Sequence, residues 1–216
     1  MIMEAIIDTI INRDFIGFQK FWHSQKNEST EYERQCLLLE ILNLYRYNTK
    51  YDFFKKVFDE ILKTKPSLDF SIDCWAPTFL SQVVNQCSKK LFMYFVDKGA
   101  NINFVGDSFL FLNEKEKEFE GEFSRYHTCL DFADLKLADK LSVDYNFSAP
   151  DIDIDEVRQQ GDLRENVTIS AAYYYDLLEQ SIYLQDLIHL DRLRDYMINS
   201  GAKTYQELKK KNYGNV

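Results

Sequence analysis

Aspartates at alternate positions are the first candidate for metal chemistry in this 216-residue chain. The row Asp151, Asp153 and Asp155 resembles the start of a calcium-binding loop, where alternating carboxylates supply oxygen ligands. The pattern then fails, because Glu156 stands at the sixth position, where glycine is needed, and Asp162 at the twelfth, where a bidentate glutamate is needed. A turn that leads into a helix cap explains the row more simply, so we expect no metal site.

The three histidines are the remaining candidates for catalysis. His23 ends a predicted helix and His127 falls in a predicted turn, whereas His189 lies near Asp186 and Asp191 in the sequence. A histidine near carboxylates can serve as a general base, but such neighbours are also common on protein surfaces. The sequence contains no G-x-S-x-G, glycine-rich phosphate loop, H-E-x-x-H or C-x-x-C motif. We therefore expect that the protein is not an enzyme and needs no cofactor.

A second row of alternating carboxylates lies in residues 104–127. If this stretch is extended, its five glutamates point to one side, because side chains alternate along a strand. Two phenylalanines precede them in a segment with strand propensity, which favours a hairpin finger that grips a basic surface. A solvated loop, or a helix supported by neighbouring Glu and Lys side chains, is the alternative. The predicted partner-binding residues are Asp107, Phe109, Phe111, Glu114, Glu116, Glu118, Glu120 and Glu122.

Charge is concentrated in two stretches of the chain. The net charge is −9, and residues 104–127 and 139–166 hold most of the excess acid. Such a chain repels the phosphates of nucleic acids and anionic lipids, so we expect neither nucleic acid nor membrane as a partner. Another protein with a basic surface is the expected partner.

The sequence also bears on the cellular compartment. No apolar run of 18 residues occurs, and Met1–Ala5 lacks the basic region and cleavage site of a signal peptide. Cys36, Cys74, Cys87 and Cys129 lack the spacing of metal ligands, which fits free thiols in a reducing compartment. We therefore expect a cytoplasmic protein.

Apolar residues recur with helical spacing over most of the chain, and only 3 prolines and 7 glycines interrupt it. Ile61-Leu62 and Phe95-Val96 occupy equivalent positions 34 residues apart, and all four side chains are expected to be buried. A single all-α domain over residues 1–216 is therefore predicted. Its expected helix pairs cover residues 3–25, 31–63, 78–97, and 128–138 together with 190–199. In the first pair, Asp14 is expected to cap the second helix. Its expected insertions are 104–127 and 139–189, with 139–166 irregular and an extra helix over 171–188.

Short motifs recur at the ends of these pairs. Thr78–Ser81 opens a helix pair and Lys98–Asn103 closes it, and both are partly repeated at Thr128–Ala133 and Ser200–Lys203. The pattern resembles an ankyrin repeat, which has a TPLH-like opening, two helices and a Gly-Ala-Asp-x-Asn-like close. The resemblance implies a solenoid of about four stacked helix pairs with two insertions near the C-terminal half. It also implies a left-handed backbone at Gly99 and Gly201.

This chain departs from the ankyrin motif at several positions. The substitutions affect the motif proline, its histidine and the glycine between the two helices. The replacing residues are Phe79 and Cys129 for proline, Ser81 and Asp131 for histidine, and Cys87 for glycine. The side-chain hydrogen bonds of the motif depend on the substituted residues, whereas the helix stacking depends on apolar spacing, which this chain retains.

The family resemblance implies a protein-binding function. We expect a non-catalytic interaction module, of bacterial type, that holds its partner through a concave face and the loop insertions. One alternative is an immunity protein that neutralises a toxin. The other is an enzyme or small-ligand-binding domain with a pocket under residues 139–189, for which a closed cavity lined by His189 and aspartates would be the evidence.

Overall fold

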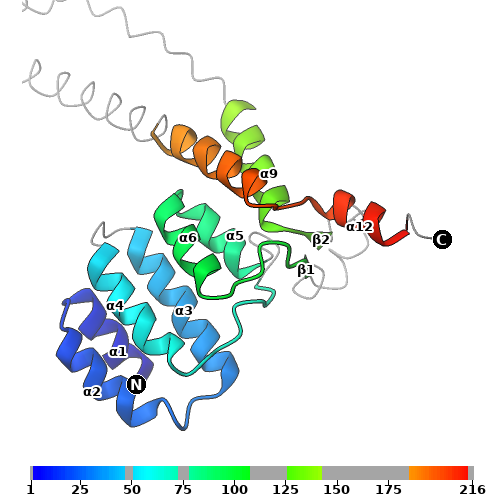
Figure 1. Ribbon diagram of the computed structural model, residues 1–216. Helices are drawn as coiled ribbons and strands as arrows, with labels where there is room; N and C mark the ends of the chain where they lie inside the picture. The colour runs from blue at the N-terminus through cyan, green and yellow to red at the C-terminus, as the bar shows by residue number, and fades with distance from the viewer. Residues whose placement is uncertain (1, 47–50, 73–77, 108–125, 143–184, 214–216) are drawn as a thin grey trace, which may run out of the picture.

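The computed structural model describes residues 2–46, 51–72, 78–107, 126–142 and 185–213, and these are mostly helical (Figure 1). The all-α class predicted from the sequence is thus confirmed for them. The helices are α1 (Ile2–Ile11), α2 (Phe15–Gln25), α3 (Glu31–Arg46), α4 (Tyr51–Leu62), α5 (Phe79–Asn85), α6 (Lys89–Asp97), α9 (Cys129–Ser142), α12 (Tyr205–Tyr213) and one over residues 185–199. Two short strands, β1 (Gly106–Asp107) and β2 (Tyr126–His127), pair antiparallel, with Gly106 opposite His127.

Local sequence signals explain where several helices begin. Asp14 accepts a hydrogen bond from the Gly17 amide at 2.8 Å and so caps α2, as its position in the sequence predicts. Thr78 caps α5, and Ser88 caps α6. The backbone N–H groups in the first turn of a helix have no acceptor within the helix. Each capping oxygen supplies such an acceptor and so defines the start of its helix.

The helices pack as pairs in chain order. Within the pairs, α1 contacts α2, α3 contacts α4, and α5 contacts α6. The first helices of the pairs, here called the inner helices, contact one another in succession from α1 through α3 and α5 to α9. The outer helices are α2, α4, α6 and the helix over 185–199, which joins α6 through the rings of Phe92 and Tyr196. The helix pairs thus form one row, and the last pair joins two helices that lie far apart in the sequence (Figure 1).

Aromatic side chains fill the core between neighbouring pairs. The Phe95 ring lies 4.8 Å from that of Phe79 and 5.0 Å from that of Phe58, centroid to centroid. All three side chains are fully buried, and so is Ile61. The prediction of burial is therefore confirmed for Ile61 and Phe95. Leu62 and Val96 are only partly buried and pack against this core from its edge.

The turns after three outer helices share one geometry. The amides of Lys65, Gly99 and Gly201 each donate to the carbonyl three residues earlier, at 3.0 Å in every case. All three residues are left-handed, with φ values of 53°, 100° and 87° in that order. The expectation for Gly99 and Gly201 is confirmed, and Lys65 holds the equivalent position after α4 without being glycine. Left-handed geometry there ends the helix and turns the chain toward the next pair.

Arg13 and Cys87 are left-handed as well, with φ values of 58° and 51°, and lie between the two helices of a pair. The left-handed region costs a residue with a Cβ about 1 kcal/mol, whereas glycine enters it freely. Cys87 therefore carries this backbone cost.

Two substitutions at these turns should change stability in opposite directions. We expect Cys87→Gly to raise the free energy of unfolding by about 0.5–1 kcal/mol, because the left-handed strain is removed. Gly99→Ala should lower it by about 1 kcal/mol through the backbone alone, since an added Cβ meets no atom within 4 Å. Urea unfolding of both variants provides the measurement, and changes of the same sign would contradict this account.

The boundaries of the expected insertions need correction. Residues 139–142, predicted to be irregular, belong to α9, because no glycine or proline occurs between Cys129 and Ser142 to stop the helix. The last outer helix is helical from 185 rather than 190. The rest of the second insertion, 143–184, lies outside the described residues, as does most of its predicted extra helix.

The helix α12 was not predicted from the sequence. Glu207 accepts from the amide of Thr204 at 2.8 Å and from its hydroxyl at 3.1 Å, which forms a capping box. A threonine followed three residues later by a glutamate is visible in the sequence, so this signal was available. It was missed because α12 has few apolar positions to mark it as a helix.

Candidate functional site

Of the predicted partner-binding residues, the structure describes Asp107 alone. Asp107 is half-buried in β1, and its amide donates to the Ser71 hydroxyl at 3.2 Å. The other seven predicted residues, Phe109, Phe111, Glu114, Glu116, Glu118, Glu120 and Glu122, lie outside the described residues. Their placement on one side of a finger stays a prediction.

The two ends of this finger segment, residues 108–125, are brought together by the strand pair. Asp107 lies opposite Tyr126, so the chain leaves and returns at neighbouring positions. Beside β2, the Cys129 thiol donates to the Ile102 carbonyl at 3.3 Å, while Ser71 holds β1. The paired residues of β1 and β2, here called the hairpin base, are therefore attached to the stack of helix pairs by hydrogen bonds.

Asparagine and aspartate side chains connect the loops of successive pairs. The Asn101 amide donates to the Asp69 carboxylate at 2.8 Å, which joins the loop after α6 to the loop after α4. On its other side, the Asn103 side chain accepts from the Lys203 amide at 2.7 Å and donates to the Gly201 carbonyl at 3.1 Å. Three consecutive loops thus form one hydrogen-bonded row, which holds the hairpin base in a defined place.

The Asp131 carboxylate makes the hydrogen bonds that tie the C-terminal segment to α9. Its carboxylate accepts from the amide and hydroxyl of Thr128, at 2.8 and 2.9 Å, and from the Tyr205 amide at 2.9 Å. The buried Thr128 hydroxyl also lies 2.8 Å from the Lys203 carbonyl. Asp131 and Thr128 therefore connect the start of α9 to the segment that leads into α12.

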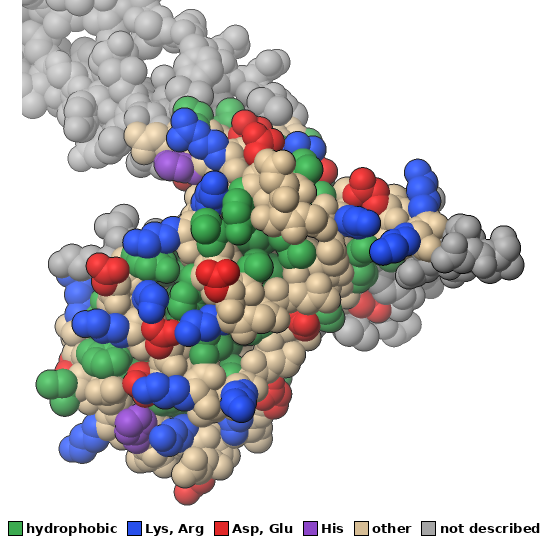
Figure 2. Space-filling view, in the orientation of Figure 1, with side chains coloured by type: hydrophobic (Ala, Val, Ile, Leu, Met, Phe, Trp, Pro, Cys, Tyr) green, Lys and Arg blue, Asp and Glu red, His purple; other side chains and the backbone are tan. Residues whose placement is uncertain are grey.

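Charge differs between the two faces of the stack. The described residues carry 20 basic and 20 acidic side chains, so the excess of acid lies in the segments outside them. Among the described side chains of α1, α3, α5 and α9, no lysine or arginine is exposed, and the exposed acids are Glu4, Asp8, Glu31, Glu33 and Glu40. Figure 2 shows that basic side chains are spread over the outer-helix face. The exposed charge of the described inner-helix side chains is therefore acidic, whereas the outer helices carry charges of both signs.

Two adjacent carboxylates on α4 join the outer helices to one another. Asp59 lies 2.7 Å from both the Lys55 and Lys98 ammonium groups and accepts from the Tyr94 hydroxyl at 3.0 Å. Glu60 is buried and interacts with Lys63 and with Gln19 and His23 of α2. Asp59 thus links α4 to α6, and Glu60 links α4 to α2.

These contacts predict a dependence of stability on pH. Burial alone raises the pKa of Asp59, but the hydrogen bonds from Lys55, Lys98 and Tyr94 outweigh it and bring the pKa to about 2, from 3.8. Because the folded-state pKa is the lower one, the stabilisation is complete above pH 3.8 and is lost as the pH falls through 2. Since the Asp59 side chain is 30% exposed, we expect its ionised carboxylate to contribute about 1 kcal/mol to the free energy of unfolding. Denaturant unfolding at several pH values should show this acid-dependent loss, and Asp59→Asn should reduce it.

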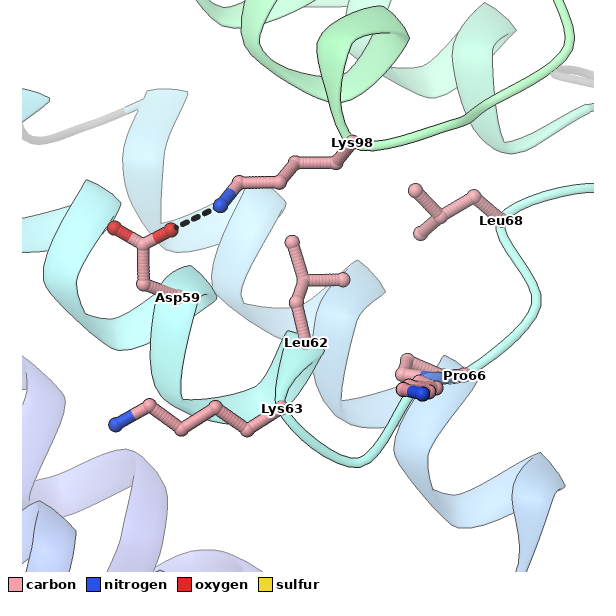
Figure 3. A pocket seen from close by; sticks show the side chains of 7 residues that line it. Asp59, Leu62, Lys63, Pro66, Leu68 and Lys98 are labelled. Carbon is pink, nitrogen blue, oxygen red and sulfur yellow. Dashed lines mark ion pairs between the residues drawn. The ribbon is translucent and has the colours of Figure 1, made fainter.

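A hollow of about 470 Å³ opens between the end of α4 and the end of α6 (Figure 3). Lys98 reaches across it from the end of α6 to Asp59 on α4, and Leu62 and Leu68 point into the space beside this ion pair. The full lining is Asp59, Leu62, Lys63, Lys65, Pro66, Leu68 and Lys98. The hollow therefore combines lysine ammonium groups with an apolar lining.

A second hollow, of about 510 Å³, lies between α6 and the helix over 185–199. Its lining is Lys89, His189, Arg192, Asp195, Tyr196 and Asn199. His189 and Asp195 are both exposed, and Lys89 lies over the Tyr196 ring at 4.8 Å. This arrangement is an open basic hollow, not the closed cavity lined by His189 and aspartates that the enzyme alternative predicted.

Metal binding and thiol chemistry are the other possibilities within the described residues. Among them, no group of three His, Cys, Asp or Glu side chains converges as a metal site. Cys36, Cys87 and Cys129 are free thiols, and burial raises the pKa of Cys129 to about 12, which keeps it protonated at neutral pH. None of the described helices is long and apolar enough to span a membrane.

No protein-family model, curated protein or solved structure matches this chain.

Proposed function

We propose that this protein is a non-catalytic interaction module that binds a protein with a basic surface. The observation that carries the proposal is the hairpin base at β1 and β2, which joins the two ends of a segment whose sequence is acidic and aromatic. Aromatic anchors supply most of the binding energy at many interfaces, while surrounding acids speed encounter with a basic partner. The exposed carboxylates of α1 and α3 add acidic charge to the inner-helix surface.

We also propose that the scaffold is an ankyrin-like solenoid. In support, the helix pairs pack in chain order, and their loops are joined in a row through Asp69, Asn101 and Asn103. Further support comes from the shared left-handed turn at Lys65, Gly99 and Gly201. A repeat array of this kind presents its inner helices and loop tips as one continuous surface, which suits the recognition of a protein.

There are two alternatives to this proposal. An immunity protein that neutralises a toxin would use the acidic surface against a basic enzyme, and it differs from the main proposal only in the identity of the partner. An enzyme or ligand-binding domain would instead use the hollow beside His189. The exposure of His189 and Asp195 favours the binding function over this alternative.

Site-specific photo-crosslinking tests the proposal even while the partner is unidentified. A benzophenone amino acid would replace Phe109 or Phe111, and the matched control would carry it at Ile16, an 80% exposed side chain on α2. We expect a basic protein from the source cell to crosslink at the finger positions and not at position 16. Equal crosslinking at all three positions, or none at the finger, would remove the support for a finger that binds a partner.

A further inference from the structure

The residues that line the hollow in Figure 3 include more lysines than carboxylates. Three lysines and one aspartate line it. Lys98 pairs with Asp59, and Lys63 pairs with Glu60, which lies outside the lining. Asp59 also pairs with Lys55 at 2.7 Å, so its single charge is shared between two ammonium groups. The lining itself is therefore cationic, and an anionic group can pair with its lysines.

Lys65 is the unbalanced cation in this hollow. Its side chain is exposed and makes no ion pair among the residues that the structure describes. It is left-handed at a turn where the two equivalent positions, Gly99 and Gly201, hold glycine. A lysine costs about 1 kcal/mol more than glycine in this conformation. The contacts of the described fold therefore do not account for a cationic side chain at position 65.

The lining also limits what the hollow can hold. The Lys63 and Lys98 side chains are 67% and 40% exposed, and ion pairs at such positions contribute only about 0–1 kcal/mol each. A small, fully hydrated anion would gain little here. Leu62, Pro66 and Leu68 supply the apolar surface that an aliphatic side chain would cover. A suitable occupant presents a carboxylate and an aliphatic group on the same face.

We propose that this hollow docks a short acidic segment of a partner protein. In that segment a glutamate or aspartate side chain pairs with Lys65, and an aliphatic side chain two residues away packs on Leu62 and Leu68. In an extended peptide, residues two apart point to the same side, so both groups enter the hollow together. This surface lies on the outer face and has the opposite charge to the finger. It goes beyond the proposed function, because either site can bind its own target without the other.

Binding of a defined peptide to the full chain tests the proposal. The probe is fluorescein-labelled Ser-Glu-Ser-Leu-Ser-Glu-Ser, with fluorescence polarisation as the readout at low ionic strength. We expect saturable binding that weakens about tenfold in Lys65→Glu and less than about twofold in Lys56→Glu, an exposed lysine on α4 that does not line the hollow. Replacing the peptide glutamates with glutamine, or its leucine with serine, should each weaken binding several-fold. Lys65→Gln, a milder change, should give an intermediate loss.

Several results would overturn the proposal. Equal losses in Lys65→Glu and Lys56→Glu would assign binding to the general charge of the outer face, and no polarisation change up to about 1 mM protein would show no site. Tighter peptide binding after Asp151, Asp153 and Asp155 are changed to Asn would make the chain's own acidic row the occupant. A dimer that Lys65→Glu dissociates in sedimentation would make a second copy the occupant. Each of these results leaves the crosslinking test of the finger unaffected, so the two proposals can fail separately.

Discussion

Replacing Phe95 with alanine is expected to lower the free energy of unfolding by about 3–5 kcal/mol. Phe95 is fully buried, and its ring lies within 5.0 Å of the rings of Phe58, Phe79 and Tyr94, measured between centroids. These rings come from three different helices, so the alanine variant leaves a cavity that no single side chain can fill by rotation. Chemical denaturation with far-ultraviolet circular dichroism provides the measurement.

Met93 offers a matched control on the same helix. Its side chain is 37% exposed, so Met93→Ala should cost about 0.5 kcal/mol or less. Phe95→Leu, which retains part of the volume, should fall between the two alanine variants. A loss below about 1 kcal/mol for Phe95→Ala would mean that the row of pairs is not packed around this ring.

The second large effect is expected at the finger, once the crosslinked partner is known. Residues 108–125 would be replaced by Asn-Gly, which can join Asp107 to Tyr126 as a two-residue turn because these residues are paired. We expect this replacement to weaken partner binding by about 100-fold or more, since it removes both the aromatic anchors and the acidic row. Biolayer interferometry would measure both rate constants. Unchanged affinity for the partner, together with an unchanged free energy of unfolding, would show that the finger is a solvated loop that does not contact the partner.

Separate substitutions distinguish the two parts of the finger. Changing Glu116, Glu118 and Glu120 to Gln should slow association and flatten its salt dependence, because long-range attraction to a basic partner is lost. Changing Phe109 and Phe111 to Ala should instead speed dissociation. The matched control for the glutamates removes three exposed acids elsewhere, through Glu28→Gln, Asp52→Asn and Asp97→Asn, and should leave association nearly unchanged.

The sequence by itself was sufficient to predict most of the described helices. Apolar periodicity predicted the pairs because each helix must bury one face against its neighbours. Asp14 and Gly99 were predicted correctly because capping and left-handed turns depend on the local chemistry of one or two residues. The same local logic would have found α12 through Thr204 and Glu207. Local interactions can be inferred from the sequence because their partners lie within a few residues.

Only the tertiary structure decided which distant side chains meet. The sequence did not indicate that Asp131 would bond Tyr205, that Asn103 would bond Lys203, or that Lys65 and Lys98 would line one hollow. Such contacts depend on how successive pairs are rotated and spaced, and that arrangement arises from the packing of large aromatic side chains across the whole stack. The periodicity of one helix carries no information about this rotation, because many partner surfaces can cover the same apolar stripe.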